Sequence, residues 1–271
     1  MAAPLTEAIP ALLQRLSSTL QRPSASYILP AVVFTTLGQA HTWIGPVYQH
    51  AVRSLPPAPS TRSPSSLYPV EDDVPRRRVV RELKEAIQKS AILIGVPRAI
   101  EAQLHLGEVI EEGAKDDSFV REELEGVEPA EARRRGRAGL ATVYQEDIGP
   151  IFEMMETDLK DVRWMSQQIT YGAFLTPLDP PTADKPSRDP LAHDPALLSI
   201  VTLSAMVPQR TPREILWHLR GALRRGIPRE EVETIHAAIA EVCAACGLKN
   251  VREGMPTVAD VEVQKEERGA E

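Results

Sequence analysis

The hydrophobic residues of this chain recur at the three- and four-residue spacing of amphipathic helices rather than at the alternate positions of strands. The sequence contains no alternating β-branched segments closed by Asn-Gly or Asp-Gly turns. Two proline-rich stretches without an apolar period, 55–64 and 176–190, are typical of loops. The pattern therefore predicts an all-α protein.

Residues 194–207 predict a helix at the centre of the core. Asp194 is suited to cap its N-terminus, and Pro195 suits the first helical position. Apolar residues then cover nearly every side of the segment, which leaves no face for solvent.

Two further helices have clear end signals. Thr211 and Glu214 predict a capping box at the start of the first, and Gly226 suits a left-handed C-terminal cap. Pro228 opens the second helix, which we expect to end at Gly247. The arginines near the end of the first helix are predicted to form a solvated face; they are Arg220, Arg224 and Arg225.

Two segments of the sequence resemble each other. Residues 78–95 match residues 229–247 in apolar spacing when Gly95 is placed on Gly247, which predicts two related helical repeats. We expect the helical connector between them to break near Gly149 and Pro150. The predicted units are 1–27, an N-terminal amphipathic helix or targeting segment; 28–110, the first repeat; 111–190, the connector and a proline-rich loop; 191–250, the second repeat; and 251–271, a polar C-terminal tail.

Composition narrows the classes of partner. The net charge is −7 with a pI of about 5.5, and aromatic residues make up 4% of the chain, which disfavours a nucleic-acid partner. No apolar run is long enough to span a bilayer. No glycine-rich phosphate loop or metal-ligand spacing is present, so the sequence predicts no cofactor and no metal.

The N-terminus and the cysteine count bear on the compartment. Helically spaced leucines with Arg15 and Arg22 are typical of a mitochondrial presequence, whereas Glu7 favours a retained helix. Two cysteines can form one disulfide at most, which is too few to stabilise a chain of 271 residues. This cysteine count favours a reducing compartment. We expect a cytoplasmic protein, with the mitochondrion as the alternative.

The two cysteines, Cys243 and Cys246, have the C-x-x-C spacing of redox centres. Cys246 continues the apolar stripe of the last helix and lies at its C-terminal end, where the helix dipole raises a thiol's pKa. No Lys, Arg or His lies within four residues on the N-terminal side. We therefore predict a structural pair.

Residues 217–247 carry a family pattern. A histidine precedes a short helix ending in A-L-x-x-G, and an E-E-V helix that closes at glycine follows. The residues are His218, Ala222, Leu223, Gly226, Glu230, Glu231, Val232 and Gly247. The pattern resembles the carboxymuconolactone decarboxylase and alkylhydroperoxidase D-like superfamily, well across 194–250 and faintly over 28–110, and the layout is similar to longer fungal members. The resemblance implies an alkylhydroperoxidase D-like helical bundle of two repeats, with 191–250 as the decarboxylase-like repeat, and a homo-oligomer.

The resemblance does not extend to the peroxidase branch of that superfamily. That branch has cysteines seven and four residues before the histidine, and a glutamate twelve residues before the first cysteine. These positions are Thr211, Glu214 and Ser199 here. Cys243 and Cys246 lie on the next helix, so they do not inherit the peroxidase role by alignment.

The decarboxylase branch lacks the cysteines and keeps the histidine. The resemblance implies removal of CO2 from a small carboxylated ring compound, with His218 as general acid/base because an imidazole titrates near neutral pH. Glu214, one turn earlier, is the candidate that orients the imidazole. The candidate substrate-binding residues are Arg210, Arg213 and Arg220, which could contact a carboxylate through two hydrogen bonds, and Trp217 as a pocket wall.

Structural interpretations stand beside these functional ones. His218 shares a helix face with Ile215 and Ala222 and is also consistent with a buried core histidine. Trp164 and Tyr171 of the connector are candidates for a pocket wall, for core or for an interface between protomers. Three functions remain open: a decarboxylase- or isomerase-like enzyme acting on a carboxylated or phenol-derived small molecule, a catalytically silent helical assembly subunit, and a thiol-dependent peroxidase using Cys243 and Cys246.

Overall fold

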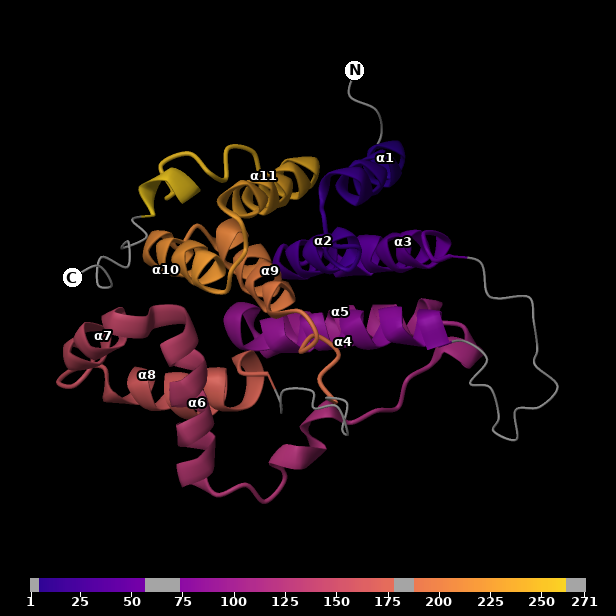
Figure 1. The fold of residues 1–271 in the computed structure, drawn as a ribbon. Coiled ribbons are helices and arrows are strands. Elements are labelled where there is room, and N and C mark those ends of the chain that lie inside the picture. The colour runs from indigo at the N-terminus through magenta and orange to yellow at the C-terminus, as the bar shows by residue number, and fades with distance from the viewer. Residues whose placement is uncertain (1–4, 57–73, 178–187, 262–271) are drawn as a thin grey trace, which may run out of the picture.

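The structure is a computed structural model that describes residues 5–56, 74–177 and 188–261. Every regular element in these ranges is helical, which confirms the all-α prediction (Figure 1). Of the predicted loops, 57–64 and 178–187 lie outside the described residues. A helix both long enough and apolar enough to cross a membrane does not occur in the described ranges.

Two helices at the centre of the molecule have no polar face. They are α2 (Ala25–Thr36) and α9 (Pro195–Met206), which pack against each other. Every residue of α2 is buried, and so is α9 from Ala196 onward. The Asp194 carboxylate accepts a hydrogen bond from the backbone N–H of Ala196, which confirms the predicted N-cap.

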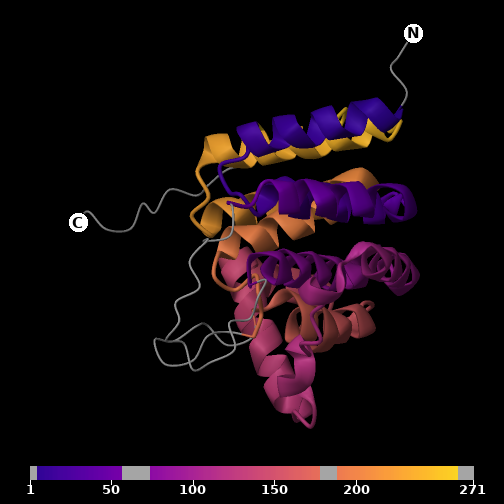
Figure 2. The same cartoon turned by 90° about the vertical axis from the view of Figure 1, so that its right-hand side faces the viewer.

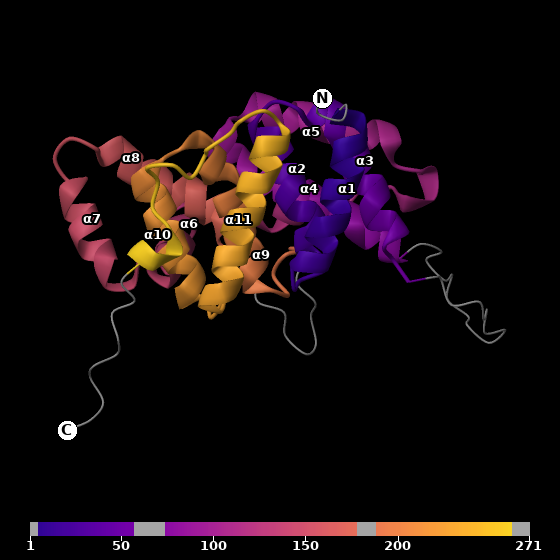
Figure 3. The ribbon, with the colours of Figure 1, turned by 90° about the horizontal axis from the view of Figure 1, so that it is seen from above.

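The surrounding helices form tiers on both sides of this pair (Figure 2). The middle tier also contains α3 (Ala40–Arg53) and α10 (Pro212–Arg224); the tier above contains α1 (Leu5–Thr19) and α11 (Arg229–Ala245); the tier below contains α4 (Val74–Ile94) and α5 (Val96–Val109). α1 and α11 lie side by side (Figure 3), with Arg15 and Glu241 paired at 2.6 Å. The amphipathic N-terminal segment is therefore packed on the body of the fold.

The predicted left-handed cap at Gly226 is confirmed, and the last helix ends before Gly247 as expected. Gly226 and Gly247 follow α10 and α11 with φ of 81° and 85°, a conformation that residues with a Cβ rarely adopt; Gly95, which follows α4, also has a positive φ, 98°. The shared glycine ends of α4 and α11 agree with the alignment of 78–95 on 229–247. The two-repeat organisation itself stays a prediction.

The connector forms a separate lobe below α10. Its main elements are α6 (Pro129–Tyr144), α7 (Ile148–Met154), α8 (Lys160–Met165) and the ten-residue π-helix η4 (Ser166–Leu175), with short 3₁₀ turns η1 (Glu112–Ala114), η2 (Val120–Leu124) and η3 (Gln145–Asp147). The break predicted near Gly149 and Pro150 falls a few residues earlier, at the η3 turn between α6 and α7. Both residues lie in the first turn of α7, where proline needs no hydrogen-bond partner, and the chain turns at Gln145, whose φ is 45°.

The predicted solvated face on α10 is also wrong. Arg220 donates to the Asp147 carboxylate at 2.8 Å, and Arg224 binds Glu146 and Asp147. Arg225 turns inward and donates to the Ser199 hydroxyl at 2.9 Å. Arg220 and Arg224 therefore join α10 to the acidic η3 turn of the connector lobe. The local sequence pattern does not predict this pairing.

The predicted polar C-terminal tail is corrected over residues 251–261. The short turn η5 (Val207–Gln209) precedes α10, and η6 (Val258–Asp260) is the last element of the described chain. Val251, Val258 and Val261 are buried, and Arg229 donates to the backbone carbonyls of Val258 and Val261. The segment therefore packs on the body, and residues 262–271 lie outside the described part.

A buried ionic group holds the end of the π-helix on the bundle. The Lys89 ammonium lies 2.9 Å from Asp189, 3.2 Å from Glu85 and 2.8 Å from the carbonyl oxygen of Phe174, which it hydrogen-bonds. Because three oxygens surround one buried cation, the charge of Lys89 is compensated and the C-terminal end of η4 is fixed against α4.

Glycines allow the π-helix to approach α6 closely. A Cβ at Gly136 would overlap the carbonyl of Gln167, and one at Gly172 would lie 2.7 Å from the same oxygen. A Cβ at Gly139 would lie 3.1 Å from the ring of Tyr171. The position of Tyr171 therefore depends on the absence of side chains at these sites.

Gly136→Ala tests this dependence. The added methyl group meets backbone rather than a movable side chain, so we expect a loss of about 2 kcal/mol or more in the free energy of unfolding. The matched control is Gly107→Ala in α5, where a Cβ meets nothing within 4 Å and the helix should gain about 0.5–1 kcal/mol. Urea unfolding measures both, and equal stability of the two variants would contradict the proposed close packing.

Candidate functional site

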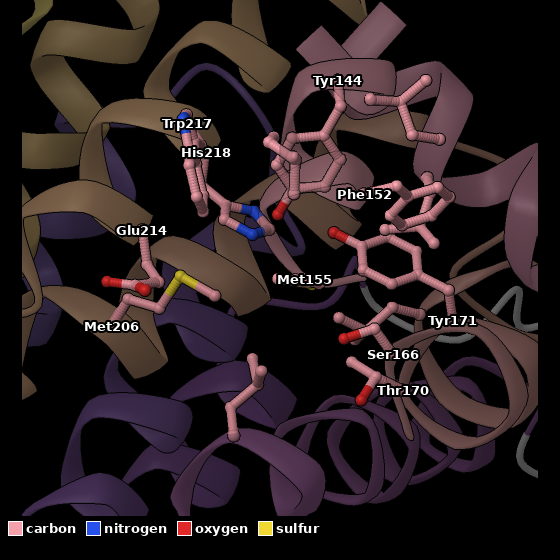
Figure 4. Close-up of a pocket in the computed structure, with 15 residues that line it drawn as sticks. Tyr144, Phe152, Met155, Ser166, Thr170, Tyr171, Met206, Glu214, Trp217 and His218 are labelled. Atoms are coloured by element: carbon pink, nitrogen blue, oxygen red, sulfur yellow. The ribbon is translucent and has the colours of Figure 1, made fainter. Parts of the chain in front are cut away.

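A cavity of about 120 Å³ lies between the bundle and the connector lobe. The bundle contributes α4, α9 and α10, and the lobe contributes α6, α7 and η4 (Figure 4). The lining is mostly apolar: Leu93, Leu140, Ile148, Ile151, Phe152, Met155, Leu175 and Met206, with Tyr144, Ser166, Thr170, Tyr171, Glu214, Trp217 and His218. The local sequence pattern does not predict this cavity, because its walls come from segments far apart in the chain.

His218 lies in this cavity wall. Ile215 and Ala222 on the same helix face are buried, as predicted, and His218 is only 3% exposed. Its Nδ1 is buried without a hydrogen-bond partner. Burial, together with the nearby positive charge of Arg225, lowers the pKa of His218 to about 3. The imidazole is therefore neutral near pH 7, and the acid/base role of His218 stays a prediction.

Two tyrosines of the connector lobe converge on His218. Figure 4 shows the hydroxyls of Tyr144 and Tyr171 pointing toward the imidazole. Tyr171 is 4% exposed, and its hydroxyl interacts with the hydroxyl of Tyr144. Burial raises the pKa of both phenols, so each keeps its proton. The Tyr144 ring also meets the Trp217 ring edge-on, with centroids 5.6 Å apart.

Glu214 and Trp217 both reach the cavity, but Glu214 does not make the contacts predicted for it. Both residues line the cavity. Thr211 occupies the N-cap position, but its side chain makes no capping hydrogen bond, so the predicted capping box is wrong. No hydrogen bond joins Glu214 to His218 in the described ranges, so the orienting contact is not formed here. Trp164, the other connector candidate, is 54% exposed and lies in neither core nor cavity wall.

The arginines predicted to bind substrate lie away from this cavity, and their role stays a prediction. Arg210 donates to the backbone carbonyls of Asn250 and Glu253, and Arg220 binds Asp147. Arg213 is exposed. None of the three is among the lining residues. The arginine that does influence the site is Arg225, which the sequence analysis placed on a solvated face.

The two cysteines are separate from this cavity. Cys243 is buried in α11 and Cys246 is its half-buried C-cap residue, and both are free thiols. Burial raises the pKa of Cys243 to about 12 and that of Cys246 to about 11. This placement agrees with the structural interpretation of the pair. Within the described ranges, no group of three or more His, Cys, Asp or Glu residues is arranged to hold a metal ion.

Comparisons with known proteins give one distant relative. No protein-family model and no solved structure matches the chain. The chain is 22% identical over 238 residues to Peroxisomal protein 2 of Schizosaccharomyces pombe, which covers 88% of this chain and 94% of that protein. An identity this low does not establish a family, so the resemblance to the carboxymuconolactone decarboxylase superfamily stays a prediction.

The burial of the thiols predicts slow native labelling. A thiol with a pKa near 11 has a thiolate fraction about a hundredfold or more below that of a free cysteine. We therefore expect a maleimide at pH 7.5 to modify Cys246 at least a hundredfold more slowly than free cysteine, and Cys243 only after unfolding. Guanidinium-denatured protein, with two fast-reacting thiols, is the control. Rapid native modification of both would restore the thiol-dependent alternative.

The buried histidines predict acid lability. Burial lowers the pKa of His218 to about 3 and, with Arg252 nearby, that of His236 to about 4, whereas unfolded histidine titrates near about 6.5. Between these values the unfolded chain binds protons that the folded chain does not. Lowering the pH from about 6.5 toward 4 should therefore cost about 1.4 kcal/mol of unfolding free energy per pH unit for each histidine.

His236→Gln isolates one of these contributions. Both ring nitrogens of His236 are buried without partners, and the residue lies outside the cavity lining. Urea unfolding at several pH values should show a shallower loss of stability in the variant than in the wild-type protein. Identical pH slopes would mean that His236 is protonated in the folded state.

Proposed function

We propose that the cavity at His218 is the active site of a carboxymuconolactone decarboxylase-like enzyme that moves a proton on a small ring-shaped metabolite. One observation carries the proposal: His218 and Tyr171, both almost fully buried, line the same mostly apolar cavity, and Nδ1 of His218 has no hydrogen-bond partner among the described residues. Buried polar groups normally find partners within the fold, so a histidine nitrogen that lacks one at a cavity supports a site for a ligand.

The protonation states assign the roles. The neutral imidazole of His218 is the proton acceptor, and the protonated phenols of Tyr171 and Tyr144 are the hydrogen-bond donors. A proton leaves a carbon next to a carbonyl group and moves to the imidazole. The electron pair shifts to the carbonyl oxygen, where the phenols and the nearby charge of Arg225 stabilise the enolate. Return of the proton to carbon completes an isomerisation, and loss of CO2 would give the same enolate.

Exchange of carbon-bound hydrogen for deuterium tests the proposal. Cyclohexanone is a suitable probe, because it is a single ring with exchangeable hydrogens beside a carbonyl. In D2O followed by NMR, we expect the wild-type protein to accelerate exchange and His218→Gln to lower that acceleration about a hundredfold or more. His236→Gln removes a comparably buried histidine outside the cavity and should leave the rate unchanged. Equal rates for wild type and His218→Gln would refute the acceptor role.

A catalytically silent assembly subunit is the second candidate. It is favoured by the exposed apolar residues of the connector lobe, which are Met154, Leu159, Val162, Trp164 and Met165. Such a subunit would give no exchange above the buffer rate. A homo-oligomer remains a prediction. The compartment also remains a prediction: cytoplasm, with the mitochondrion as alternative, and the name of the fission yeast relative adds the peroxisome.

A further inference from the structure

The cavity at His218 is selective in size. Its volume of about 120 Å³ is near that of engineered apolar cavities, about 150 Å³, which remain dry and take up benzene. A nucleotide, an acyl chain or a fused ring system exceeds this volume. The cavity as it stands therefore fits one six-membered ring with a small substituent, and the apolar side chains around it provide the contacts for the ring.

The charges at the cavity disfavour a carboxylate. No lysine or arginine is among the lining residues, and the one acidic residue among them is Glu214. The guanidinium of Arg225 lies outside the lining and donates to Ser199. A ligand carboxylate would therefore lose water without a lining cation to pair with, which is costly in a mostly apolar site.

The polar end of the cavity matches a hydroxyl group. A neutral imidazole has one nitrogen that accepts a hydrogen bond, and the protonated phenol of Tyr171 can donate one. A hydroxyl both donates and accepts, so it can satisfy the two groups at once. A hydrocarbon satisfies neither, and a carboxylate has no proton for the imidazole.

We propose that the cavity binds a neutral, single-ring molecule of the phenol or cyclic-enol class, with its hydroxyl between the imidazole of His218 and the hydroxyl of Tyr171. The inference rests on the proposed function in taking this cavity as the ligand site, and it narrows the substrate from carboxylated or phenol-derived compounds to the phenol-derived class. The enol of a ring ketone has the same shape and the same hydroxyl, so binding and proton transfer use one geometry.

Calorimetric titration of the full chain with phenol, toluene and benzoate at pH 7.5 tests the inference. The three probes share a ring and differ in the substituent: a hydroxyl, a methyl and a carboxylate. We expect phenol to bind at least tenfold more tightly than either of the others. Tyr171→Phe should remove most of the preference for phenol over toluene while toluene still binds.

The matched control is Tyr48→Phe. Tyr48 is another buried tyrosine, on α3, and its hydroxyl donates to Glu111 away from the cavity. This variant should keep the preference of the wild-type protein for phenol. Thermal unfolding of both variants confirms that they are folded, and if Tyr171→Phe does not fold, the preference among the three probes in the wild-type protein decides.

Each outcome separates the inference from the proposed function. Tighter binding of benzoate would mean that Arg225 reaches the ligand, and it would overturn the hydroxyl assignment while leaving the deuterium-exchange test untouched. Equal binding of phenol and toluene, or no binding of any probe, would also overturn it. Selective binding of phenol without accelerated exchange on cyclohexanone would uphold the inference and reject the proposed enzyme.

Discussion

Two central helices without a polar face impose the main constraint on this fold. α2 and α9 pack on each other and must be covered on every remaining side, since exposing either to water would lose the hydrophobic stabilisation of the core. The tiers above and below supply this cover. The arrangement also places α10 at the edge of the bundle, where its outer face is free to receive the connector lobe through Arg220 and Arg224.

The contact between the connector lobe and the helical bundle determines the protonation states of the residues at the cavity. His218 alone would be an ordinary histidine on an amphipathic helix. Once α6, α7 and η4 cover it, loss of water keeps the imidazole neutral and the phenols of Tyr144 and Tyr171 protonated. The same physical effect suppresses the thiolates of Cys243 and Cys246 on the far helix. Burial therefore keeps the imidazole and the phenols uncharged at one position and the thiols protonated at the other.

The local sequence pattern does not predict the π-helix η4. Its residues looked like an ordinary aromatic-rich helix, yet Tyr171 reaches the cavity because α6 has glycines where η4 approaches and because Lys89 fixes the end of η4. Wide helical turns of this kind are rare and frequently lie at functional sites. Nothing in the spacing of the connector residues signals one, because its stability comes from contacts with α4 and α6 rather than from its own periodicity.

The sequence by itself determined the all-α class, the burial of α9, the glycine ends of α10 and α11, and the burial of Cys243, since each follows from periodicity and local backbone preferences. Only the tertiary structure decided which side chains meet. It paired Arg220 with Asp147, turned Arg225 toward Ser199 and brought Tyr171 to His218. Charge and hydrogen-bond partners come from segments distant in the chain, and a one-dimensional pattern does not encode the desolvation that such neighbours impose.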